Sequence, residues 1–398
     1  MGSVPATAYL FAGRALRDVG DGFAAVLLPA YLIALGLTPL QVGILATAAL
    51  LGSALLTLAV GYLGARHDHR RLLLAAAVLM IASGAAFAVV HDYAVLLMVA
   101  FAGTINPSSG SVSVFVPLEH AVLAREVEDR NRTRAFARYS LVGALAGSVG
   151  ALAAAVPDFL GTAATDPLLG FKLMFAAYAA LGLAAGLMYA RVPPRPPSPD
   201  TGASAALGPS RRVVYKLAAL FSLDAFAGGF VVQSLLALWL FERFDMSLAA
   251  ASAFFFASGV LAAFSFPVAA WLARHIGLVN TMVFTHIPSS VCLILAAFAP
   301  TLPVALALLL VRAALSQMDV PTRSSYVMAV VTPPERAAAA SVTSVPRSLA
   351  AAASPALAGG LLAAAFQGWP LVICGALKIV YDVLLLFQFR HLKAPEER

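Results

Sequence analysis

The fold is decided by the stretch YLFAGRALRDVGDGFAAVLLPAYLIAL, residues 9–35, which has the length and apolar content of a membrane-spanning helix but carries four charges. The charged residues are Arg14, Arg17, Asp18 and Asp21. At about 100° per residue they share one narrow arc, with each arginine one turn before an aspartate. A charge at the centre of a bilayer costs about 2.5–3.5 kcal/mol on insertion scales, so this stripe must face a bundle interior or a watery cavity.

The composition of the whole chain agrees with a polytopic membrane protein. Of the 398 residues, 61% are hydrophobic and 11% are charged, and the mean hydropathy is +0.89. This leaves too little polar surface for a soluble domain. Hydrophobic runs of spanning length predict an all-α fold of twelve transmembrane helices, at 8–35, 39–64, 72–90, 93–120, 136–156, 168–190, 213–241, 247–273, 278–299, 302–328, 338–366 and 369–390.

Basic residues mark one side of the membrane. They follow the second, fourth, sixth and twelfth predicted helices, whereas the loops between are short and nearly free of Lys and Arg. The positive-inside rule therefore predicts that both termini are cytoplasmic, in a cell membrane (inner or plasma). The net charge of +7 is explained by this topology, so the expected surroundings are the lipid bilayer and no nucleic-acid partner is required. The basic residues are Arg66, Arg70, Arg71, Arg125, Arg130, Arg132, Arg134, Arg191, Arg195, Arg211, Arg212, Arg390, Lys393 and Arg398.

A proline-rich stretch at 191–212 divides the chain into two halves. It contains six prolines together with Gly and Ser, a composition typical of an extended linker. Residues 1–190 and 213–398 are each predicted to form a six-helix bundle. The halves also share sequence pairs at similar positions, which indicates an internal repeat. These are Val116-Pro117 with Val320-Pro321, Arg132 with Arg336, and Gly22-Phe23 with Gly229-Phe230.

Twelve helices in two parallel repeats, with a cytoplasmic linker and termini, resemble the Major Facilitator Superfamily (MFS) over essentially the whole chain. The superfamily signature Gly-x-Leu-Ala-Asp-Arg-x-Gly-Arg-Arg is present in part as GYLGARHDHR at 61–70, where Ala65 replaces Asp and Asp68 replaces Gly. A weaker counterpart, AWLARHIG, follows the eighth helix at 270–277. The resemblance implies a secondary transporter that is monomeric and is not an enzyme; it assigns no subfamily.

In this family the signature loop latches the cytoplasmic gate. Because Ala65 has no carboxylate, the acidic partner of the latch is expected from Asp68, Glu119 or Glu335. The sequence around Glu119 otherwise reads as a solvated cytoplasmic loop. The resemblance implies gating roles for Arg66, Asp68, Arg70, Glu119, Arg132 and Arg336.

The family layout implies that helices one, four, seven and ten line a central cavity, and polar residues gather on those helices. Pro107 beside Asn106 predicts a locally irregular segment, which is tolerated in a membrane where it lines a cavity. Asp319 is expected to pair with Arg312 or Arg323. The candidate substrate-binding residues are Arg14, Arg17, Asn106, Arg312, Gln317, Asp319 and Arg347.

Three carboxylates are candidates for proton or cation coupling, Asp18, Asp21 and Asp224. No basic residue lies within one helical turn of Asp224, which favours proton exchange at that position. Other polar residues of the second half are read as structural. These are His286 as a packing residue of a peripheral helix, and Lys378 with Asp382 as an i, i+4 pair.

The chain lacks the motifs GxxxxGK[ST], HExxH and CxxC, so no catalytic, cofactor or metal site is expected. The sequence predicts proton-coupled transport of a small polar or charged solute by alternating access. Export is slightly favoured, because Gly143, Gly147 and Gly150 partly match an antiport pattern of helix five. One alternative is uptake of an anionic solute through an arginine-lined site. Another is a sensor that transports nothing, for which the missing acid at position 65 is the hint.

Overall fold

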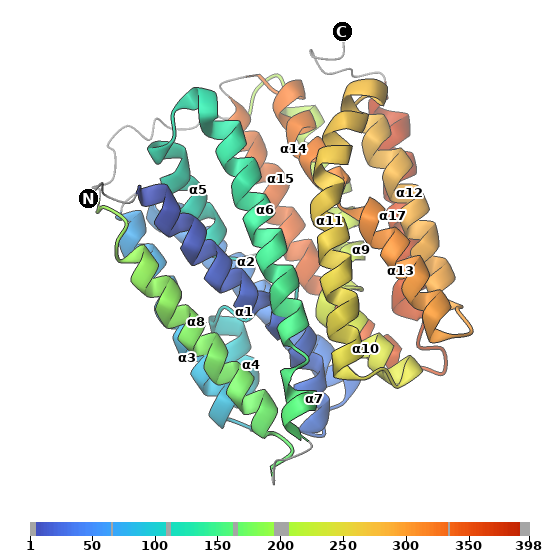
Figure 1. Ribbon diagram of the computed structural model, residues 1–398. Coiled ribbons are helices and arrows are strands. Elements are labelled where there is room, and N and C mark those ends of the chain that lie inside the picture. The colour runs from blue at the N-terminus through green and yellow to red at the C-terminus, as the bar shows by residue number, and fades with distance from the viewer. Residues whose placement is uncertain are drawn as a thin grey trace. The chain divides into compact units, whose positions relative to one another are not determined.

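The computed structural model describes residues 5–64, 67–108, 113–161, 166–194, 207–332 and 335–390. Within these ranges the chain forms seventeen helices and no strand (Figure 1). The helices coincide with the twelve predicted spans once broken helices are joined, which confirms the all-α polytopic fold. Eight spans contain one long helix each: α1 Ala6–Ala34, α2 Pro39–Gly64, α3 His69–Val89, α6 Asp129–Ala153, α8 Leu169–Tyr189, α11 Leu248–Ile276, α12 Leu278–Ala297 and α17 Trp369–Phe389; the short α7, Val156–Gly161, follows α6.

Four spans are broken into two helices. The sequence indicates a break only near Asn106, whose side-chain oxygen accepts a hydrogen bond from Ser108 N at 2.8 Å and so stabilises a turn. In the eleventh span the break falls at Pro355, which has no N–H to continue a helix. In the tenth, the Thr322 hydroxyl donates to the carbonyls of Met318, at 3.1 Å, and Asp319, at 2.9 Å. The pairs are α4 Tyr93–Ala102 with α5 Phe115–Glu126, α9 Arg211–Gly229 with α10 Gln233–Phe244, α13 Leu302–Ser316 with α14 Asp319–Val330, and α15 Arg336–Ala353 with α16 Pro355–Leu362.

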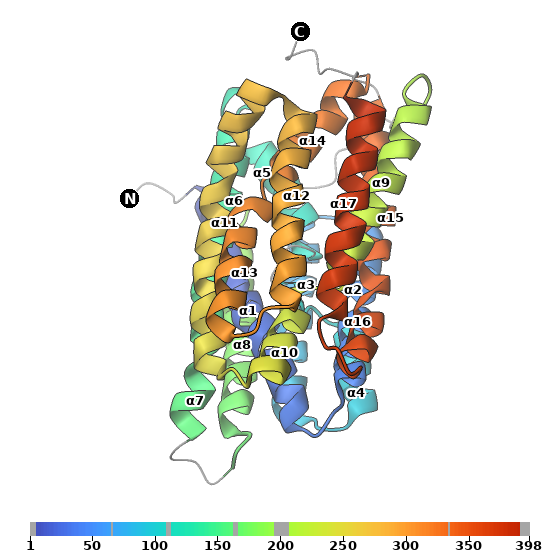
Figure 2. The same cartoon turned by 90° about the vertical axis from the view of Figure 1, so that its right-hand side faces the viewer.

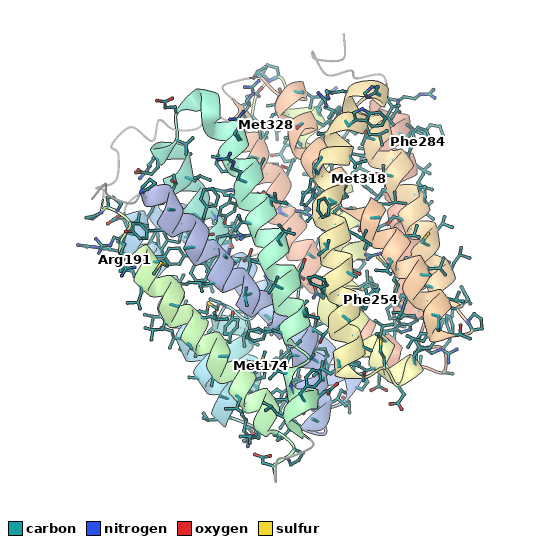
Figure 3. All side chains as sticks on the ribbon, in the orientation of Figure 1. Met174, Arg191, Phe254, Phe284, Met318 and Met328 are labelled. Atoms are coloured by element: carbon teal, nitrogen blue, oxygen red, sulfur yellow. The ribbon has the colours of Figure 1, made fainter. Side chains whose placement is uncertain are left out.

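The helices have the composition of membrane spans. By length and composition, eight described segments can cross a membrane, and two shorter helices, Tyr93–Ala102 and Leu302–Ser316, are also apolar. Large apolar side chains lie on their outer surfaces, such as Phe284, which projects from α12 and is 59% exposed (Figure 3). α1 is not among the eight segments. Its four charges are all buried, so they do not face the lipid.

The chain divides into two compact units. The first unit comprises Met1–Asp200 with Val232–Phe256, and the second comprises Thr201–Val231 with Ala257–Arg398. The units differ from the predicted halves at residues 232–256, because α10 packs against α1 and α2. The division into halves at 190 and 213 stays a prediction.

Equivalent helices pack in the same way within each unit, as expected for a repeat. In the first unit α1 packs on α6 and α8, and α3 packs on α8. In the second unit α9 packs on α15 and α17, and α12 packs on α17, as Figure 2 shows for α12 and α17. The contacts among spans one, three, five and six of the first unit therefore recur among spans seven, nine, eleven and twelve of the second.

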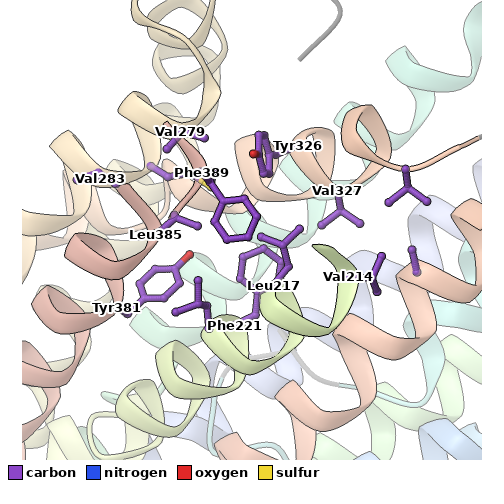
Figure 4. Close-up of a cluster of buried hydrophobic side chains, with 14 residues drawn as sticks. Val214, Leu217, Phe221, Val279, Val283, Tyr326, Val327, Tyr381, Leu385 and Phe389 are labelled. Atoms are coloured by element: carbon purple, nitrogen blue, oxygen red, sulfur yellow. The ribbon is translucent and has the colours of Figure 1, made fainter. Parts of the chain in front are cut away.

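Glycines permit the closest of these contacts. A Cβ on Gly22 of α1 would collide with the Gly147 carbonyl of α6, and a Cβ on Gly150 would collide with the Val19 carbonyl. In the second unit, a Cβ on Gly229 of α9 would collide with the Ser354 hydroxyl and with the Ala351 carbonyl of α15. The second unit also has a cluster of buried apolar side chains from α9, α12, α14, α15 and α17 (Figure 4).

Candidate functional site

The four charges of α1 form a buried network with the predicted pairing. Arg14 Nε lies 2.7 Å from Asp18 Oδ2, and Arg17 Nη1 lies 3.1 Å from Asp21 Oδ2. Arg17 Nη1 also lies 2.9 Å from Asp18 Oδ1. Arg17 is fully buried, at 0% exposed, so its charge depends on these carboxylates for stabilisation.

Glu119 of α5 belongs to the same network, which we call the Arg17 cluster: Arg14, Arg17, Asp18, Asp21 and Glu119. Its carboxylate lies 3.3 Å from Arg17 Nη2 and accepts hydrogen bonds from the hydroxyls of Tyr189, at 2.5 Å, and Tyr139. Glu119 is 0% exposed, so the expectation of a solvated loop residue is wrong. α5 already begins at Phe115, and it carries Glu119 to Arg17. The gating role of Glu119 stays a prediction.

Aromatic side chains enclose the Arg17 cluster. The Tyr178 hydroxyl donates to Asp21 Oδ1 at 3.1 Å. The guanidinium of Arg14 lies over the Tyr139 ring, 4.6 Å from its centroid, and that of Arg17 lies over the Phe115 ring at 5.0 Å. These contacts stabilise the cations without adding negative charge. Three carboxylates therefore face two guanidinium groups in a buried site.

The glycine pattern of helix five has a structural reason beside the Arg17 cluster. A Cβ on Gly143 would lie 2.5 Å from Arg14 Nε and from Asp18 Oδ2. Glycine at this position therefore leaves room for the ion pair, while Gly147 and Gly150 permit close packing of α6 on α1.

The second unit has a different buried network around Asp224 of α9. Lys378 Nζ of α17 lies 2.5 Å from Asp224 Oδ1, and Arg323 Nη1 of α14 lies 3.2 Å from Asp224 Oδ2. Arg323 Nη1 also lies 2.9 Å from Asp319 Oδ2, which decides between the two predicted partners of Asp319. No basic residue lies within one turn of Asp224 on α9, and both of its cationic partners come from other helices. Its coupling role stays a prediction.

His286 and Asp382 extend this network, which we call the Asp224 cluster: Asp224, His286, Asp319, Arg323, Lys378 and Asp382. His286 Nδ1 lies 3.1 Å from both Asp382 oxygens, and Lys378 Nζ lies 3.4 Å from His286 Nε2. His286 is 3% exposed. The predicted Lys378–Asp382 pair is wrong, since α17 directs Lys378 to α9 and Asp382 to α12. The packing role of His286 stays a prediction.

Two predicted arginines of the second unit lie outside these ion pairs. Among the described residues, neither Arg312 nor Arg347 forms an ion pair. Arg347 lies within electrostatic range of Arg323 and Asp224, and its buried Nε atom has no hydrogen-bond partner in the described part of the chain. The buried hydroxyl of Tyr381 likewise has no partner there.

The other candidate substrate residues do not join either cluster. Gln317 is exposed at the break between α13 and α14. Asn106 is buried in the first unit, where it stabilises the turn described above. Cys292 and Cys374 are free thiols. No group of three or more His, Cys, Asp and Glu side chains in the described ranges is arranged to hold a metal ion.

The predicted gating residues have mixed outcomes. Arg66 and the side chain of Arg132 lie outside the described residues. Asp68 caps α3, where its carboxylate accepts a hydrogen bond from Arg70 N at 3.1 Å. Arg336 is exposed at the start of α15. Their gating roles stay predictions.

Glu335 makes a compact set of contacts just before α15. Its carboxylate accepts hydrogen bonds from the hydroxyls of Thr332, at 2.5 Å, and Ser210, at 2.7 Å, and from Gly208 N. These donors, the Thr332 hydroxyl first, hold the pKa of Glu335 below its ordinary value. Glu335 thereby fixes the segment that precedes α9.

Comparisons with known proteins place this helical, polar-centred fold among membrane transporters that are not enzymes. The family model for the Major Facilitator Superfamily matches residues 10–313, and the chain belongs to that superfamily. The uncharacterized membrane protein YJR124C of Saccharomyces cerevisiae is 24% identical over 418 residues, which cover 96% of this chain and 93% of that protein.

Solved transporters have the same fold. A mutant of the nucleoside transporter NupG is 13% identical with a TM-score of 0.78, over 96% of this chain and 100% of that one. The inward-open xylose transporter XylE from E. coli is 16% identical with a TM-score of 0.76, over 98% of each chain. A bacterial metal transporter is 14% identical with a TM-score of 0.71, over 97% of this chain and 99% of that one. At these identities the likeness establishes the fold and leaves the substrate open.

Proposed function

We propose that this chain is a proton-coupled secondary active transporter that moves a small polar or charged solute by alternating access. The observation that carries the proposal is the Arg17 cluster, in which three buried carboxylates face two guanidinium groups. An unbalanced buried charge is costly. Binding of one proton, or of one small cation, balances the cluster.

Asp18 is the carboxylate best suited to bind this proton. Tyrosine hydroxyls donate hydrogen bonds to the carboxylates of Asp21 and Glu119, so both carboxylates already act as hydrogen-bond acceptors. Asp18 has ion pairs with Arg14 and Arg17, but its buried Oδ1 accepts no well-aligned hydrogen bond from the described residues. Protonation of Asp18 removes its attraction for both guanidinium groups, and it can thereby change which conformation of the transporter is favoured.

An anionic solute is the second candidate, because the free polar atoms around the Asp224 cluster are donors. Arg312 and Arg347 form no ion pair among the described residues, and Arg347 Nε and the Tyr381 hydroxyl have no hydrogen-bond partner there. Guanidinium groups match carboxylate and phosphate oxygens. Asn106, Gln317 and Asp319 remain candidates for contacts with the uncharged part of the solute.

Export is the proposed direction of transport. Export is favoured only by Gly143, Gly147 and Gly150, and close packing beside α1 also accounts for these glycines. The direction is therefore a proposal to be decided by orientation-controlled flux measurements.

Proton flux in proteoliposomes tests the proposal. The purified protein is reconstituted with a lumenal pH dye, and cationic drugs, metal ions, sugars and organic acids are added under an imposed proton gradient. We expect proton movement triggered by one solute class, lost in Asp18→Asn. The matched control is Asp166→Asn, which changes a carboxylate of the same unit that lies just before α8 and pairs with Lys172 at 2.8 Å. Coupled flux that persists in Asp18→Asn contradicts the assignment, and silence across the panel favours the sensor.

A further inference from the structure

His286 lies close enough to Asp224 and Lys378 that adding one proton to its ring can change which cation pairs with Asp224. On one side of the imidazole, Nδ1 lies 3.1 Å from both oxygens of Asp382. On the other side, Nε2 lies 3.4 Å from Lys378 Nζ and 3.9 Å from Asp224 Oδ1. The imidazole ring therefore lies between two carboxylates. It contacts Asp382 directly, whereas Lys378 is the partner of Asp224.

The partners of His286 fix its tautomer. A carboxylate can only accept, so Nδ1 carries the hydrogen and donates it to Asp382. Nε2 then presents its lone pair to Lys378, whose ammonium donates to it and also to Asp224.

We propose that His286 is a second proton-binding site, and that its protonation displaces Lys378 from Asp224. A proton from water adds to the Nε2 lone pair, and the hydrogen bond from Lys378 Nζ to Nε2 is lost. Two cations then lie 3.4 Å apart, and they repel each other. His286 Nε2 lies 3.9 Å from Asp224 Oδ1, so the new N–H can donate to this oxygen after a small side-chain shift.

The displaced Lys378 becomes available to an anion. Asp224 keeps Arg323 at 3.2 Å and gains the imidazolium, so its charge stays neutralised without Lys378. The free ammonium then adds a third kind of donor to the unpartnered Arg347 Nε and Tyr381 hydroxyl. The exchange itself is a property of the second unit, whereas its role in coupling solute binding to protons rests on the proposed function.

Other charged and titratable groups surround His286 from each element packed on α12. These groups act on both the neutral and the protonated form of His286. The effects of Lys378 and Asp224 on its titration must therefore be isolated by substitution. From α17 they are Cys374, Lys378, Tyr381 and Asp382; from α13, Arg312; from α14, Asp319, Arg323 and Tyr326; and from α9, Asp224.

Histidine hydrogen–deuterium exchange mass spectrometry of the full chain in nanodiscs tests the exchange. The method reads the pH midpoint of each imidazole from the slow exchange at its C2 carbon, and it requires no transported solute. In Lys378→Gln we expect the midpoint of His286 to rise by about one to three pH units, because a nearby like charge is removed. In Asp224→Asn we expect it to fall, because the acceptor of the imidazolium is lost.

His275 is the internal control in every sample. It is exposed near the end of α11, where its ring nitrogen lies 2.7 Å from the Trp271 carbonyl, and its midpoint should not move. Lys378→Gln leaves Arg323 on Asp224, so this variant is expected to fold even where Asp224→Asn does not. A midpoint of His286 that is unchanged or lowered in Lys378→Gln overturns the proposal. Failure of proton flux with the expected midpoints would instead refute the transport function and leave the exchange intact.

Discussion

The Arg17 cluster and the Asp224 cluster occupy equivalent helices of the two repeats, and each joins three carboxylates to two permanent cations, but only the second unit has further arginines outside these ion pairs. In the first, three carboxylates face two guanidinium groups, and tyrosine hydroxyls donate to the carboxylates. In the second, Asp224, Asp319 and Asp382 are accompanied by Lys378 and Arg323, with Arg312 and Arg347 outside any ion pair of the described residues. The repeat thus preserves helix packing while the buried charges differ.

This difference assigns separate chemistry to the two units. The uncompensated carboxylate of the Arg17 cluster favours a proton or cation, whereas the arginines of the second unit that lie outside its ion pairs favour an anion. The predictions below test this difference through the stability of each cluster, beginning with the largest effect.

Arg17→Gln should destabilise the protein most. It leaves three buried carboxylates with Arg14 alone, and breaking a buried ion pair costs about 3–5 kcal/mol. Thermal unfolding in detergent measures the loss, with exposed Arg191→Gln as the control. Adding Glu119→Gln should restore part of the stability, because it removes one of the uncompensated charges. Equal stability of Arg17→Gln and wild type would show that water enters the cluster.

Lys378→Gln should cost less than Arg17→Gln. Asp224 keeps its 3.2 Å contact with Arg323 and loses one charged hydrogen bond, worth about 1.5–3 kcal/mol, while the longer contact of Lys378 with His286 is lost as well. The same unfolding assay compares the two variants directly. If Lys378→Gln is the more damaging of the two, Arg323 and the unpaired arginines of the second unit do not compensate for the loss of Lys378, and the comparison fails.

Gly22→Ala should separate α1 from α6, because the added Cβ meets the Gly147 carbonyl. Overpacking of this kind costs about 1–3 kcal/mol. Gly229→Ala should have a similar effect in the second unit if the repeat preserves the contact. Gly61→Ala is the control, since a Cβ there has nothing within 4 Å. A difference between Gly22→Ala and Gly61→Ala close to zero would contradict the close contact.

The smallest effect concerns Glu335. The pKa of Glu335 is held below its ordinary value. Its hydrogen bonds therefore contribute stability at a pH above the ordinary pKa, and this stability is lost as the pH falls through the lowered pKa of the folded state. We therefore expect the Gly208 amide to lose protection from hydrogen exchange in acid, after correction for the intrinsic rate. Glu335→Gln should remove this pH dependence. Protection that does not change with pH in the wild type would show that Glu335 does not fix this segment.

The membrane-spanning helices and the repeat could be read from the sequence, because both depend on local patterns. Apolar runs have the length of a bilayer, and pairs such as Val116-Pro117 and Val320-Pro321 recur at matching positions. The ion pairs of α1 were also predictable, because i, i+4 spacing brings side chains together within one helix.

The tertiary structure decided every contact made between helices. Glu119 joins Arg17 across 102 positions, and Lys378 joins Asp224 across 154, distances at which no periodicity predicts a pair. The i, i+4 rule paired Lys378 with Asp382, which was wrong, and it offered no partner for Asp224, whose partners come from other helices. A buried charge takes the partner that the packed helices bring closest, so the sequence determined which residues must be buried and the fold determined which of them meet.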